Sequence, residues 1–445
     1  NVYGGLQDNG VWYGPSTDNP EDSWFLRGRD NYERIGGGDG MMVEVDWRDN
    51  STIYSGSQFG FYYRYNTKTK DKVRIKPVHE LGERPLRFNW ETPIFLSRHN
   101  QDILYYGANR LYRSMNKGDD LEAISPDLTN GGMKGNVSYG TLTSVYESEL
   151  KFGLLYTGSD DGAVYVSQNS GDSWTDISIG LPEKMWVSQI FASKHKESRV
   201  YVSLNGYRWD HFYPYIFVSE DYGNTWKQIG NNLPLEPLNV VKEDPINENI
   251  IYVGTDHGVY VSIDAGNDFM AFSKGLHDAP VHDLAIHPDK SDLILGTHGR
   301  SIYIADVSGV QKLPKIKNKT LVLFPPDIQR YSPNWGMQWS NYSEAIEPEL
   351  IISCYTKSVD ELSFTIYTES NEKLNTKTIS SSRGLQSFSY DLSISEDLLK
   401  KVSKKNEKLK ELRPADNGKI YLTKGNYKIE LRKSDEVVME KLIIE

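Results

Sequence analysis

The sequence is poor in cysteine and has no long apolar run. Cys354 is the single cysteine of 445 residues, so neither an intrachain disulfide nor a zinc site made of several thiolates can form. No stretch approaches the roughly 20 consecutive apolar residues that a membrane-spanning helix needs. The first residues, NVYGGLQDNG, have neither the basic start nor the apolar core of a signal peptide. We therefore expect no membrane span, and a numbering that begins inside a longer or processed chain.

Positive charge is also in short supply. Fifty Lys and Arg residues stand against 61 Asp and Glu residues, which gives a formal net charge of -11. Because nucleic acids are bound mainly through clustered basic side chains, they are disfavoured as partners. The glycine-rich stretch 36–40, GGGDG, has no phosphate-loop lysine, and the histidines lack the spacing of a metal site. We expect no cofactor and no metal.

What the sequence does contain is a repeat. Two close copies are YTGSDDGAVYVSQNSGDSW from Tyr156 and IYVGTDHGVYVSIDAGNDF from Ile251. Each copy reads as a run typical of a strand, a turn rich in Gly, Asp or Asn, a second run and a second turn, which predicts hairpins. The serines before the second turn are spaced by 43 to 53 residues, the period of a four-stranded propeller blade: Ser114, Ser167, Ser219 and Ser262.

The second turn has the pattern Ser-x-Asp-x-Gly-x-x-Trp, complete at Ser219, Asp221, Gly223 and Trp226. Asp can bind nearby backbone N–H groups, and Gly accepts a backbone conformation that few residues tolerate. The pattern resembles the Asp-box, or BNR, repeat of sialidases, sortilin-type receptors and two-propeller xyloglucanases. In those families the box is a strand turn remote from the active site, so the resemblance implies a structural role for its aspartates.

The repeat predicts an all-β fold: a seven-bladed β-propeller over residues 1–310, with an incomplete first blade at 1–34. The further blades are expected at 37–77, 91–126, 139–177, 186–230, 237–273 and 280–306. No inner-strand run precedes NVYGG, so either the last segment closes the ring or an upstream part is missing.

The repeat stops near residue 306. Residues 311–330 read as a linker, and the alternating runs of 331–445 predict a small immunoglobulin- or fibronectin-like β-sandwich. Near 395–413 a charged helical insert is expected, with Ser395 as its N-cap.

The candidate site residues follow from the alternation of strand direction in a blade. The turns between second and third strands, and the segments that lead into the next blade, share the face opposite the Asp-boxes. Paired carboxylates there could serve as acid and base in glycosidic cleavage. The candidate catalytic residues are Asp8, Glu91, Asp160, Asp161, Asp210 and Asp256. The candidate ligand-binding residues are Trp90, Trp209, His211, His257, His298 and Arg300.

A structural interpretation of these residues stays open. Asp, Asn and Gly at hairpin tips are what tight turns require whatever the function, which applies to Asp8, Asp160, Asp161 and Asp256. The insertion 205–215 departs most from the repeat, and propellers place specificity in such departures.

Several further strings resemble the sortilin-like BNR-repeat proteins of bacteria, which are often named glycosyl hydrolase-like. They are YGGLQDNG, GGGDG, RFNW, YGANRLYRS, ISPDLT and GTHGRSIYI. The resemblance covers about 1–445 and implies an exported protein of Bacteroidota-like bacteria, in the periplasm, at the outer-membrane surface or outside the cell. It also implies that this chain is the C-terminal half, with a second propeller ahead of it, and it supplies no established catalytic residues.

Three hypotheses about function follow. The leading one is an exported or cell-surface module that binds a glycan or an extracellular protein. The alternative is a xyloglucanase-like glycoside hydrolase. The third is a structural component of a larger exported complex.

Overall fold

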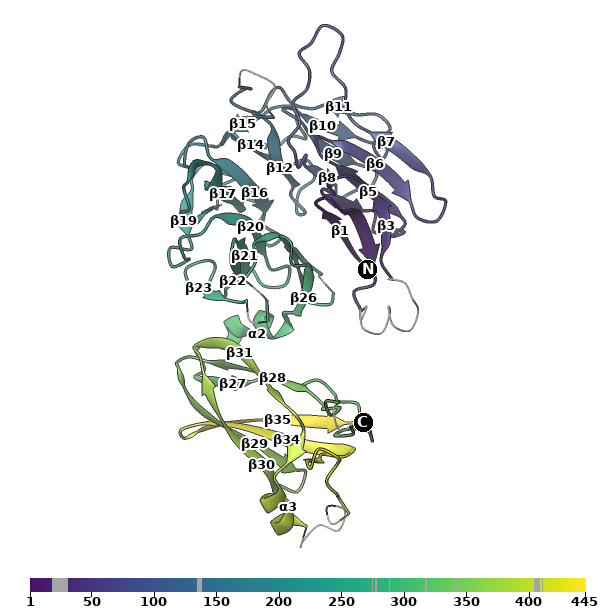
Figure 1. Ribbon diagram of the computed structural model, residues 1–445. Helices are drawn as coiled ribbons and strands as arrows, with labels where there is room; N and C mark the ends of the chain where they lie inside the picture. Colours follow the sequence, from purple (N-terminus) through teal and green to yellow (C-terminus); the bar gives the residue numbers. More distant parts are fainter. Residues whose placement is uncertain are drawn as a thin grey trace. The chain divides into compact units, whose positions relative to one another are not determined.

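The structure is a computed structural model that describes the chain except residues 18–30, 134–137, 274, 277, 288, 317, 339, 341–342, 404–408 and 410. The chain divides into two compact units, Asn1–Val307 (unit 1) and Ser308–Glu445 (unit 2). Strands dominate both units (Figure 1). No helix among the described residues is long and apolar enough to cross a membrane.

Unit 1 is a series of antiparallel sheets, each built from consecutive strands (Figure 1). Within the described residues five sheets have four strands: β4 (Val43–Val45), β5 (Thr52–Ser57), β6 (Phe61–Asn66) and β7 (Lys72–Ile75); β8 (Ile94–Leu96), β9 (Leu104–Gly107), β10 (Leu111–Ser114) and β11 (Glu122–Ala123); β12 (Leu142–Glu147), β13 (Leu155–Ser159), β14 (Val164–Ser167) and β15 (Thr175–Asp176); β16 (Trp186–Ala192), β17 (Val200–Asn205), β18 (Tyr215–Ser219) and β19 (Lys227–Ile229); β20 (Leu238–Glu243), β21 (Ile251–Thr255), β22 (Gly258–Ser262) and β23 (Phe269–Ala271).

Three-stranded sheets stand at the two ends of this series. The first contains β1 (Val2–Leu6), β2 (Gly10–Gly14) and β3 (Glu33–Gly36), and the last contains β24 (Val281–Ile286), β25 (Asp292–Thr297) and β26 (Ile302–Asp306). The last strands form a sheet of their own and do not pair with β1–β3. The two end sheets still touch, because a Cβ built on Gly4 would lie 3.1 Å from Cδ1 of Ile302.

The first strands of successive sheets contact one another from β1 and β4 through β8, β12, β16 and β20 to β24. Sheets of this kind, joined in sequence through their first strands, form a β-propeller, so the predicted all-β propeller is present in unit 1. The sheets fall inside the predicted blade ranges except the first, because β3 extends to Gly36, two residues beyond the predicted range 1–34. Seven blades as the full number stays a prediction.

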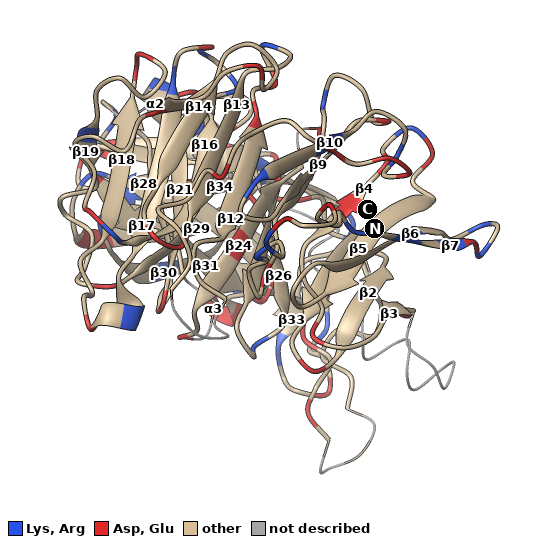
Figure 2. Cartoon of the chain, turned by 90° about the horizontal axis from the view of Figure 1, so that it is seen from above, with Lys and Arg blue, Asp and Glu red and all other residues tan. Residues whose placement is uncertain are grey.

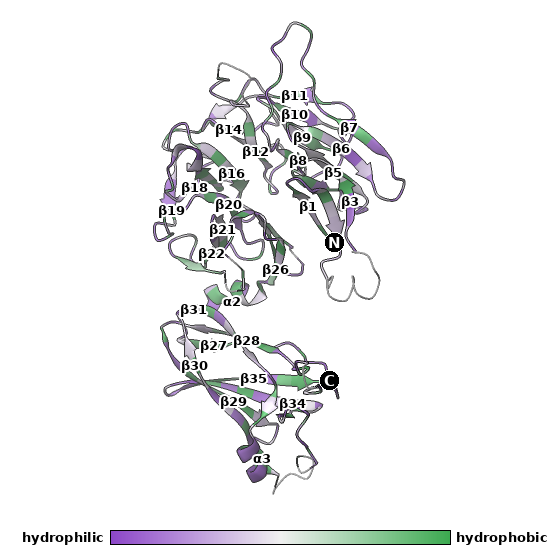
Figure 3. Ribbon diagram, in the orientation of Figure 1, coloured by the Kyte–Doolittle hydropathy of each residue, from purple (hydrophilic) through white to green (hydrophobic). Residues whose placement is uncertain are grey.

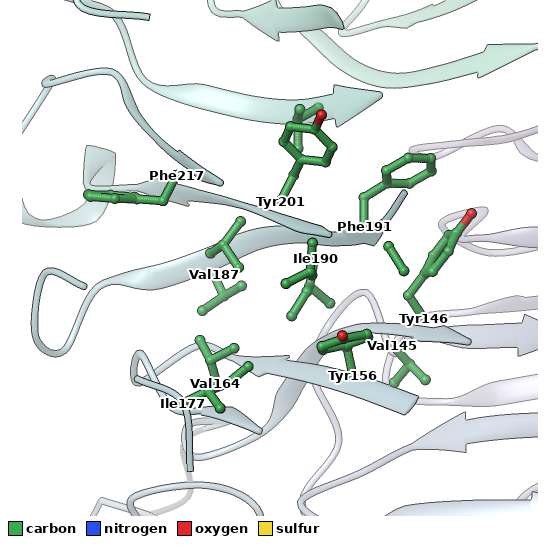
Figure 4. Packing of buried hydrophobic residues seen from close by; sticks show 14 of the residues in the cluster. Val145, Tyr146, Tyr156, Val164, Ile177, Val187, Ile190, Phe191, Tyr201 and Phe217 are labelled. Carbon is green, nitrogen blue, oxygen red and sulfur yellow. The ribbon is translucent and has the colours of Figure 1, made fainter. Parts of the chain in front are cut away.

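The blades are held together by apolar side chains that the strands present on both faces. In β13 and β21 every residue is buried, as expected for strands that lie between two other sheets. Figure 4 shows the packing where β12 and β16 meet, and the rings of Tyr146 and Phe191 lie beside each other there. Burying each such side chain contributes roughly 1.5–3 kcal/mol. Figure 3 shows hydrophobic residues concentrated on the strands, and Figure 2 shows charged residues mainly on the turns.

The Asp-box turns have the local chemistry that the sequence predicts. The Asp221 carboxylate accepts hydrogen bonds from the Ser219 hydroxyl (2.7 Å) and from the backbone N–H of Thr225 (2.9 Å). Gly223 has φ +92°, and a Cβ there would lie 2.4 Å from Cδ1 of Ile177. The indole N–H of Trp226 donates to the Ile177 carbonyl of the preceding sheet (2.7 Å). The box therefore joins neighbouring blades.

A second kind of contact also joins blades, through buried carboxylates. Glu243 ends β20, is 1% exposed, and accepts hydrogen bonds from the Ser193 hydroxyl (2.7 Å) and the Lys194 N–H (2.9 Å) of the preceding sheet. Glu147 ends β12 in the same way and accepts from the Ser97 hydroxyl (2.5 Å). We call this arrangement the glutamate clasp.

Unit 2 contains two antiparallel sheets and a two-stranded ladder. One sheet has β27 (Leu321–Leu323), β28 (Leu350–Thr356) and β31 (Gly384–Tyr390); the other has β29 (Asp360–Thr368), β30 (Lys373–Ser381), β34 (Gly425–Lys433) and β35 (Glu436–Ile444); the ladder has β32 (Ser393–Ile394) and β33 (Ile420–Tyr421). Ile352 and Cys354 of the first sheet share one buried cluster with Phe364 and Ile429 of the second. The assignment of this unit as immunoglobulin- or fibronectin-like stays a prediction.

Two segments of unit 2 bear on the expectations from sequence. The expected linker 311–330 contains the end of helix α2 (Ser308–Ile316) and strand β27, which pairs with β28, and both are part of the second compact unit. The expected insert 395–413 contains α3 (Glu396–Val402), which follows Ser395; residues 404–408 and 410 of it lie outside the described residues.

Candidate functional site

Hydrogen bonds define the two faces of the propeller. Turns between second and third strands contact the segments that lead into first strands: Phe59 N–H donates to the Trp90 carbonyl (3.1 Å) and His298 N–H to the Pro280 carbonyl (2.8 Å). Asp-box turns instead contact the turns between first and second strands, as Tyr222 N–H does with the Ser198 carbonyl (2.8 Å). The first face, opposite the boxes, is called the loop face below. The candidate site residues lie in its turns and segments. Asp8 also belongs to this face, although it lies between the first two strands of a three-stranded sheet, because the Gly40 N–H in the segment before β4 donates to the Leu6 carbonyl beside that turn (2.9 Å).

Two of the candidate carboxylates are fully engaged inside the protein. Asp160 is 0% exposed and accepts hydrogen bonds from the Gly140 and Thr141 N–H groups (both 2.9 Å) and the Thr141 hydroxyl (2.6 Å). Burial raises the pKa of Asp160, and the bonds from Thr141 oppose that rise. Asp161 is 1% exposed and accepts from the Ser159 hydroxyl (2.6 Å) and the Asn130 N–H (2.7 Å). Both hold the turn after β13 against the segment before β12.

Three further candidates stand at turns nearer to solvent. Asp8 and Asp210 have left-handed backbones, with φ +61° and +53°. The Asp8 N–H donates to Asp39 (2.9 Å), and Asp210 ends the short helix η1 (Tyr207–Trp209). Asp256 is partly buried and accepts a hydrogen bond from the Asn239 amide (3.0 Å).

Glu91 differs from these aspartates. The residue is exposed, but desolvation of its carboxyl by the surrounding protein, followed by the charge of Asp283, raises the pKa of Glu91 to about 7. Asp283 lies on β24, the first strand of the last sheet. The structure thus brings one candidate carboxyl within electrostatic reach of a second carboxyl that sequence reasoning did not select.

Two of the three aromatic candidates are exposed, and His211 is partly buried. Trp90 is 46% exposed and meets the edge of Phe59 at 5.0 Å between ring centroids. Trp209 is also 46% exposed and lies in η1 between β17 and β18. His211 is stacked on Tyr215 (5.4 Å, 9° between planes) and hydrogen-bonds its hydroxyl (2.8 Å).

The remaining ligand candidates are three exposed side chains in turns of the loop face. His257 Nδ1 lies 3.5 Å from Oε2 of Glu236. The ring centroids of His298 and His282 are 5.5 Å apart. Burial lowers the pKa of His282, and the charge of His298 lowers it further. Arg300 is exposed in the turn before β26. Within the described residues no group of His, Cys, Asp and Glu is arranged to hold a metal ion.

Sequence reasoning missed a layer of side chains on the first strands. Each lies opposite a tyrosine on the second strand of its blade, at the same position of the repeat. The layer consists of Glu44, Phe95, Tyr146, Phe191 and Lys242. The ring centroid of Tyr146 lies 5.0 Å from that of Phe95 and 4.8 Å from that of Phe191 (Figure 4 shows Tyr146 and Phe191). The signal that could have found them is the position opposite the repeated tyrosine.

This layer also carries charge. Arg98 lies 3.6 Å from Glu44, and its charge opposes the rise that burial causes in the pKa of Glu44. Burial lowers the pKa of Lys242, which Asp283 opposes. Ionisable groups from four sheets therefore influence one another around the first strands.

Comparison with known proteins agrees with this architecture. Residues 214–417 match the model of the Sortilin-Vps10 family, described as sortilin, neurotensin receptor 3. A xyloglucanase of Hypocrea jecorina (strain QM6a) is 29% identical over 137 residues, which cover 27% of this chain and 16% of that enzyme. The chain thus corresponds to a small part of the curated relative that it matches.

Similar solved structures include two GH74 enzymes and an extracellular domain. The GH74 xyloglucanase of Xanthomonas campestris is 18% identical, with a TM-score of 0.47 over 68% of this chain and 50% of that chain. The GH74 enzyme of Niastella koreensis is 14% identical, with a TM-score of 0.48 over 98% and 70%. The extracellular domain of a hybrid two component system of B. thetaiotaomicron is 10% identical, with a TM-score of 0.46 over 99% and 55%. Residues 214–417 of the chain are thus similar to the Sortilin-Vps10 family, and the Asp-box turns of the propeller agree with this similarity.

Proposed function

We propose that this chain is the binding module of an exported or cell-surface protein, and that its loop face binds a glycan. One observation carries the proposal: the insertion between β17 and β18 leaves aromatic side chains 44–60% exposed, at Tyr207, Trp209, Phe212 and Tyr213. Clusters of exposed rings on a folded protein mark binding sites, and Tyr and Trp combine a broad apolar face with a polar atom. Sugar rings offer the matching combination of apolar faces and hydroxyl groups.

The geometry of the insertion supports a preformed surface. Tyr213 and His211 both pack on Tyr215, at 5.5 and 5.4 Å, and the guanidinium of Arg208 lies 3.9 Å from the ring of Trp186. Side chains held by their neighbours before binding lose less conformational entropy on binding. The similarity to a xyloglucanase makes a xyloglucan oligosaccharide the first probe.

A glycoside hydrolase is the second candidate function, and Glu91 favours it. A general acid must keep its proton near neutral pH, and the pKa of Glu91 is raised to about 7. Asp283 on β24 would be the second carboxylate in such a reaction. An extracellular protein, including a second propeller, is a further partner that the loop face could bind.

The test compares two aromatic variants of the full chain by isothermal titration calorimetry. Trp209→Ala removes an exposed ring from the loop face, and Phe152→Ala removes a ring of similar exposure (45%) from the turn between β12 and β13 on the opposite face. Loss of a stacked ring is expected to weaken binding by about 0.5–1.5 kcal/mol in Trp209→Ala, and Phe152→Ala should bind as the parent does.

A reducing-sugar assay on the same samples separates binding from cleavage. Binding without release of reducing ends supports the binding module. Release of reducing ends that Glu91→Gln abolishes supports the hydrolase. No binding and no cleavage with a panel of plant and bacterial glycans would contradict both and favour the structural component.

A further inference from the structure

The hairpin formed by β6 and β7 has a charge opposite to that of the whole chain. Residues 61–76 contain six Lys or Arg residues and one Asp, whereas the chain has a formal charge of -11. A basic segment of this density on an acidic protein creates a local positive potential. Neither the repeat nor the proposed glycan surface accounts for it.

Rings and cations alternate across this hairpin in a regular ladder. Tyr63 pairs with Arg74 and Tyr65 pairs with Lys72 in the antiparallel register. The Lys72 ammonium lies 4.3 Å from the centroid of Tyr63, and the Arg74 guanidinium lies 5.1 Å from that of Phe61. Because alternate residues of a strand share one face, the cations of β7 form a row with a spacing of about 7 Å. The rings of β6 hold that row in place by cation–π contact.

The row of basic side chains on β7 ends beside a pocket. Lys76 continues it, with its ammonium 4.0 Å from the centroid of Phe61 and 4.2 Å from that of Phe88. A cavity of about 500 Å³ opens here, lined by Arg74, Lys76, Pro77, Val78, His79, Pro85, Leu86 and Phe88. Its lining has no carboxylate and combines cations with apolar side chains. The volume lies in the range of cavities that hold small ligands.

The cations of this site are not neutralised by the protein. Within the part of the chain that the structure describes, none of Lys72, Arg74 and Lys76 has a carboxylate within salt-bridge distance. Lys76 instead donates to the Phe59 carbonyl (2.7 Å). Burial, followed by the charge of Arg74, lowers the pKa of Lys76. A bound anion would reverse both effects, because it would favour the charged ammonium.

The surroundings of the aromatic rings in β6 favour one class of anionic ligand over another. Single-stranded nucleic acids are bound by stacking bases on free aromatic faces. Here Lys72 and Arg74 lie over Tyr63 and Phe61, so those ring faces are already occupied. A ligand that presents carboxylate or sulfate groups with hydroxyl groups, and needs no stacking, fits better.

We propose that the β6–β7 ladder and its pocket form a second binding site, specific for an anionic saccharide that carries carboxylate or sulfate groups. The site is separate from the aromatic insertion between β17 and β18, and it adjoins the loop face through Phe59, whose ring meets Trp90. Arg74 is the specificity residue, since its guanidinium can bind a carboxylate or sulfate through two parallel N–H groups.

The experiment is isothermal titration calorimetry of the full chain with three tetrasaccharides: a galacturonic acid tetramer, a sulfated tetramer and neutral cellotetraose. We expect the first two, or one of them, to bind at the ladder, which identifies the anionic group, and we expect cellotetraose not to bind there. Raising the NaCl concentration should weaken binding, because the contacts are exposed ion pairs. Trp209→Ala should leave this binding unchanged, which keeps the result independent of the glycan surface proposed above.

Arg74→Gln is expected to weaken binding of the anionic tetramer by about tenfold or more, and Arg74→Lys to recover part of it. The matched control is Lys227→Gln, on the fourth strand of another sheet, which removes the same charge and should change affinity by less than about twofold. Arg74 is exposed, so its variants should melt as the parent does. Equal affinity for the neutral and anionic probes, no binding of either anionic probe, or equal behaviour of Arg74→Gln and Lys227→Gln overturns the proposal. Tighter binding of a short single-stranded oligonucleotide overturns the saccharide assignment.

Discussion

Removing one carboxylate of the glutamate clasp should destabilise unit 1 far more than removing an equally well-paired carboxylate on its surface. Glu243→Ala is the perturbation. In addition to the bonds from Ser193 and Lys194, the Glu243 carboxylate accepts from the Tyr201 hydroxyl (3.0 Å) and lies 3.3 Å from the Arg199 guanidinium. Ser193, Lys194 and Tyr201 lose this acceptor in the variant, whereas Arg199 keeps Glu220 and Glu248.

The magnitude follows from these contacts. Each stranded buried donor costs about 1–3 kcal/mol, and three donors lose the Glu243 carboxylate. These costs overlap, so we expect about 3–5 kcal/mol in total. For a domain of this size about 2 °C of melting temperature is lost per kcal/mol, which gives a fall of roughly 6–10 °C. Glu243→Gln keeps the shape and two lone pairs, and should lose about half as much.

The assay is differential scanning calorimetry together with urea unfolding, and the control is Glu220→Ala. Glu220 also pairs with Arg199, at 2.8 Å, but its side chain is 50% exposed, so its removal should cost about 1 kcal/mol or less. If Glu243→Ala and Glu220→Ala differ by less than about 1 kcal/mol, burial of the clasp does not contribute as argued.

Three further changes test other parts of the molecule. Asp160→Ala should lower the melting temperature by several degrees, since Thr141 loses its acceptor inside the protein, whereas a purely catalytic Asp160 would leave melting unchanged. The pKa of Glu91 is raised from 4.5 to about 7 in the folded chain, so its contribution to stability is complete below about pH 4.5 and is lost as the pH rises through about 7. Glu91→Gln should therefore gain stability relative to the parent on going from acid to weakly alkaline pH, and Asp283→Asn should move the midpoint downward; a pH-independent difference contradicts this. Trp226→Phe should cost about 1 kcal/mol for the lost indole hydrogen bond, and no cost in urea unfolding would show that the bond does not stabilise the blade contact.

The sequence was informative wherever structure is decided by contacts close together along the chain. The Asp-box is such a case, because Ser219, Asp221 and Gly223 bond within a few residues and the same pattern recurs at a regular spacing. Hairpin periodicity and turn chemistry then place the sheets, and the parity of strand direction places the turns on two faces. These predictions need no knowledge of how one blade meets the next.

Contacts between blades could not be predicted in the same way. Tyr146 and Phe191 touch although 45 residues separate them, and Glu91 is affected by Asp283 from the last sheet. A pattern within one repeat does not predict which side chains of different blades will be in contact. The aromatic and basic residues of 61–76 can be read from the sequence. Their contacts depend on the strand register, which places Arg74 opposite Tyr63.

The end of unit 1 illustrates a different limit. A change of composition near residue 306 located the boundary, but lysines and prolines suggested an extended connection where the chain forms α2 and β27. Four apolar residues of this segment, Val310, Leu313, Leu321 and Leu323, are buried. Burial against a partner decided its structure, and local propensity did not.

Agreement with the repeat separates carboxylates that have a structural role from those that stay candidates for a function. Asp160 and Asp161 fit the repeated turn, and each is buried among donors that belong to the blade, which leaves little for a ligand to bind. Glu91 and the insertion that carries Trp209 depart from the repeat, and they keep solvent access together with a shifted pKa or an exposed ring. A propeller built from near-identical units meets its packing needs with the residues that recur, because the same contact must form in every blade. The side chains available for recognition are then those that only one blade has, and experiments on function should begin with them.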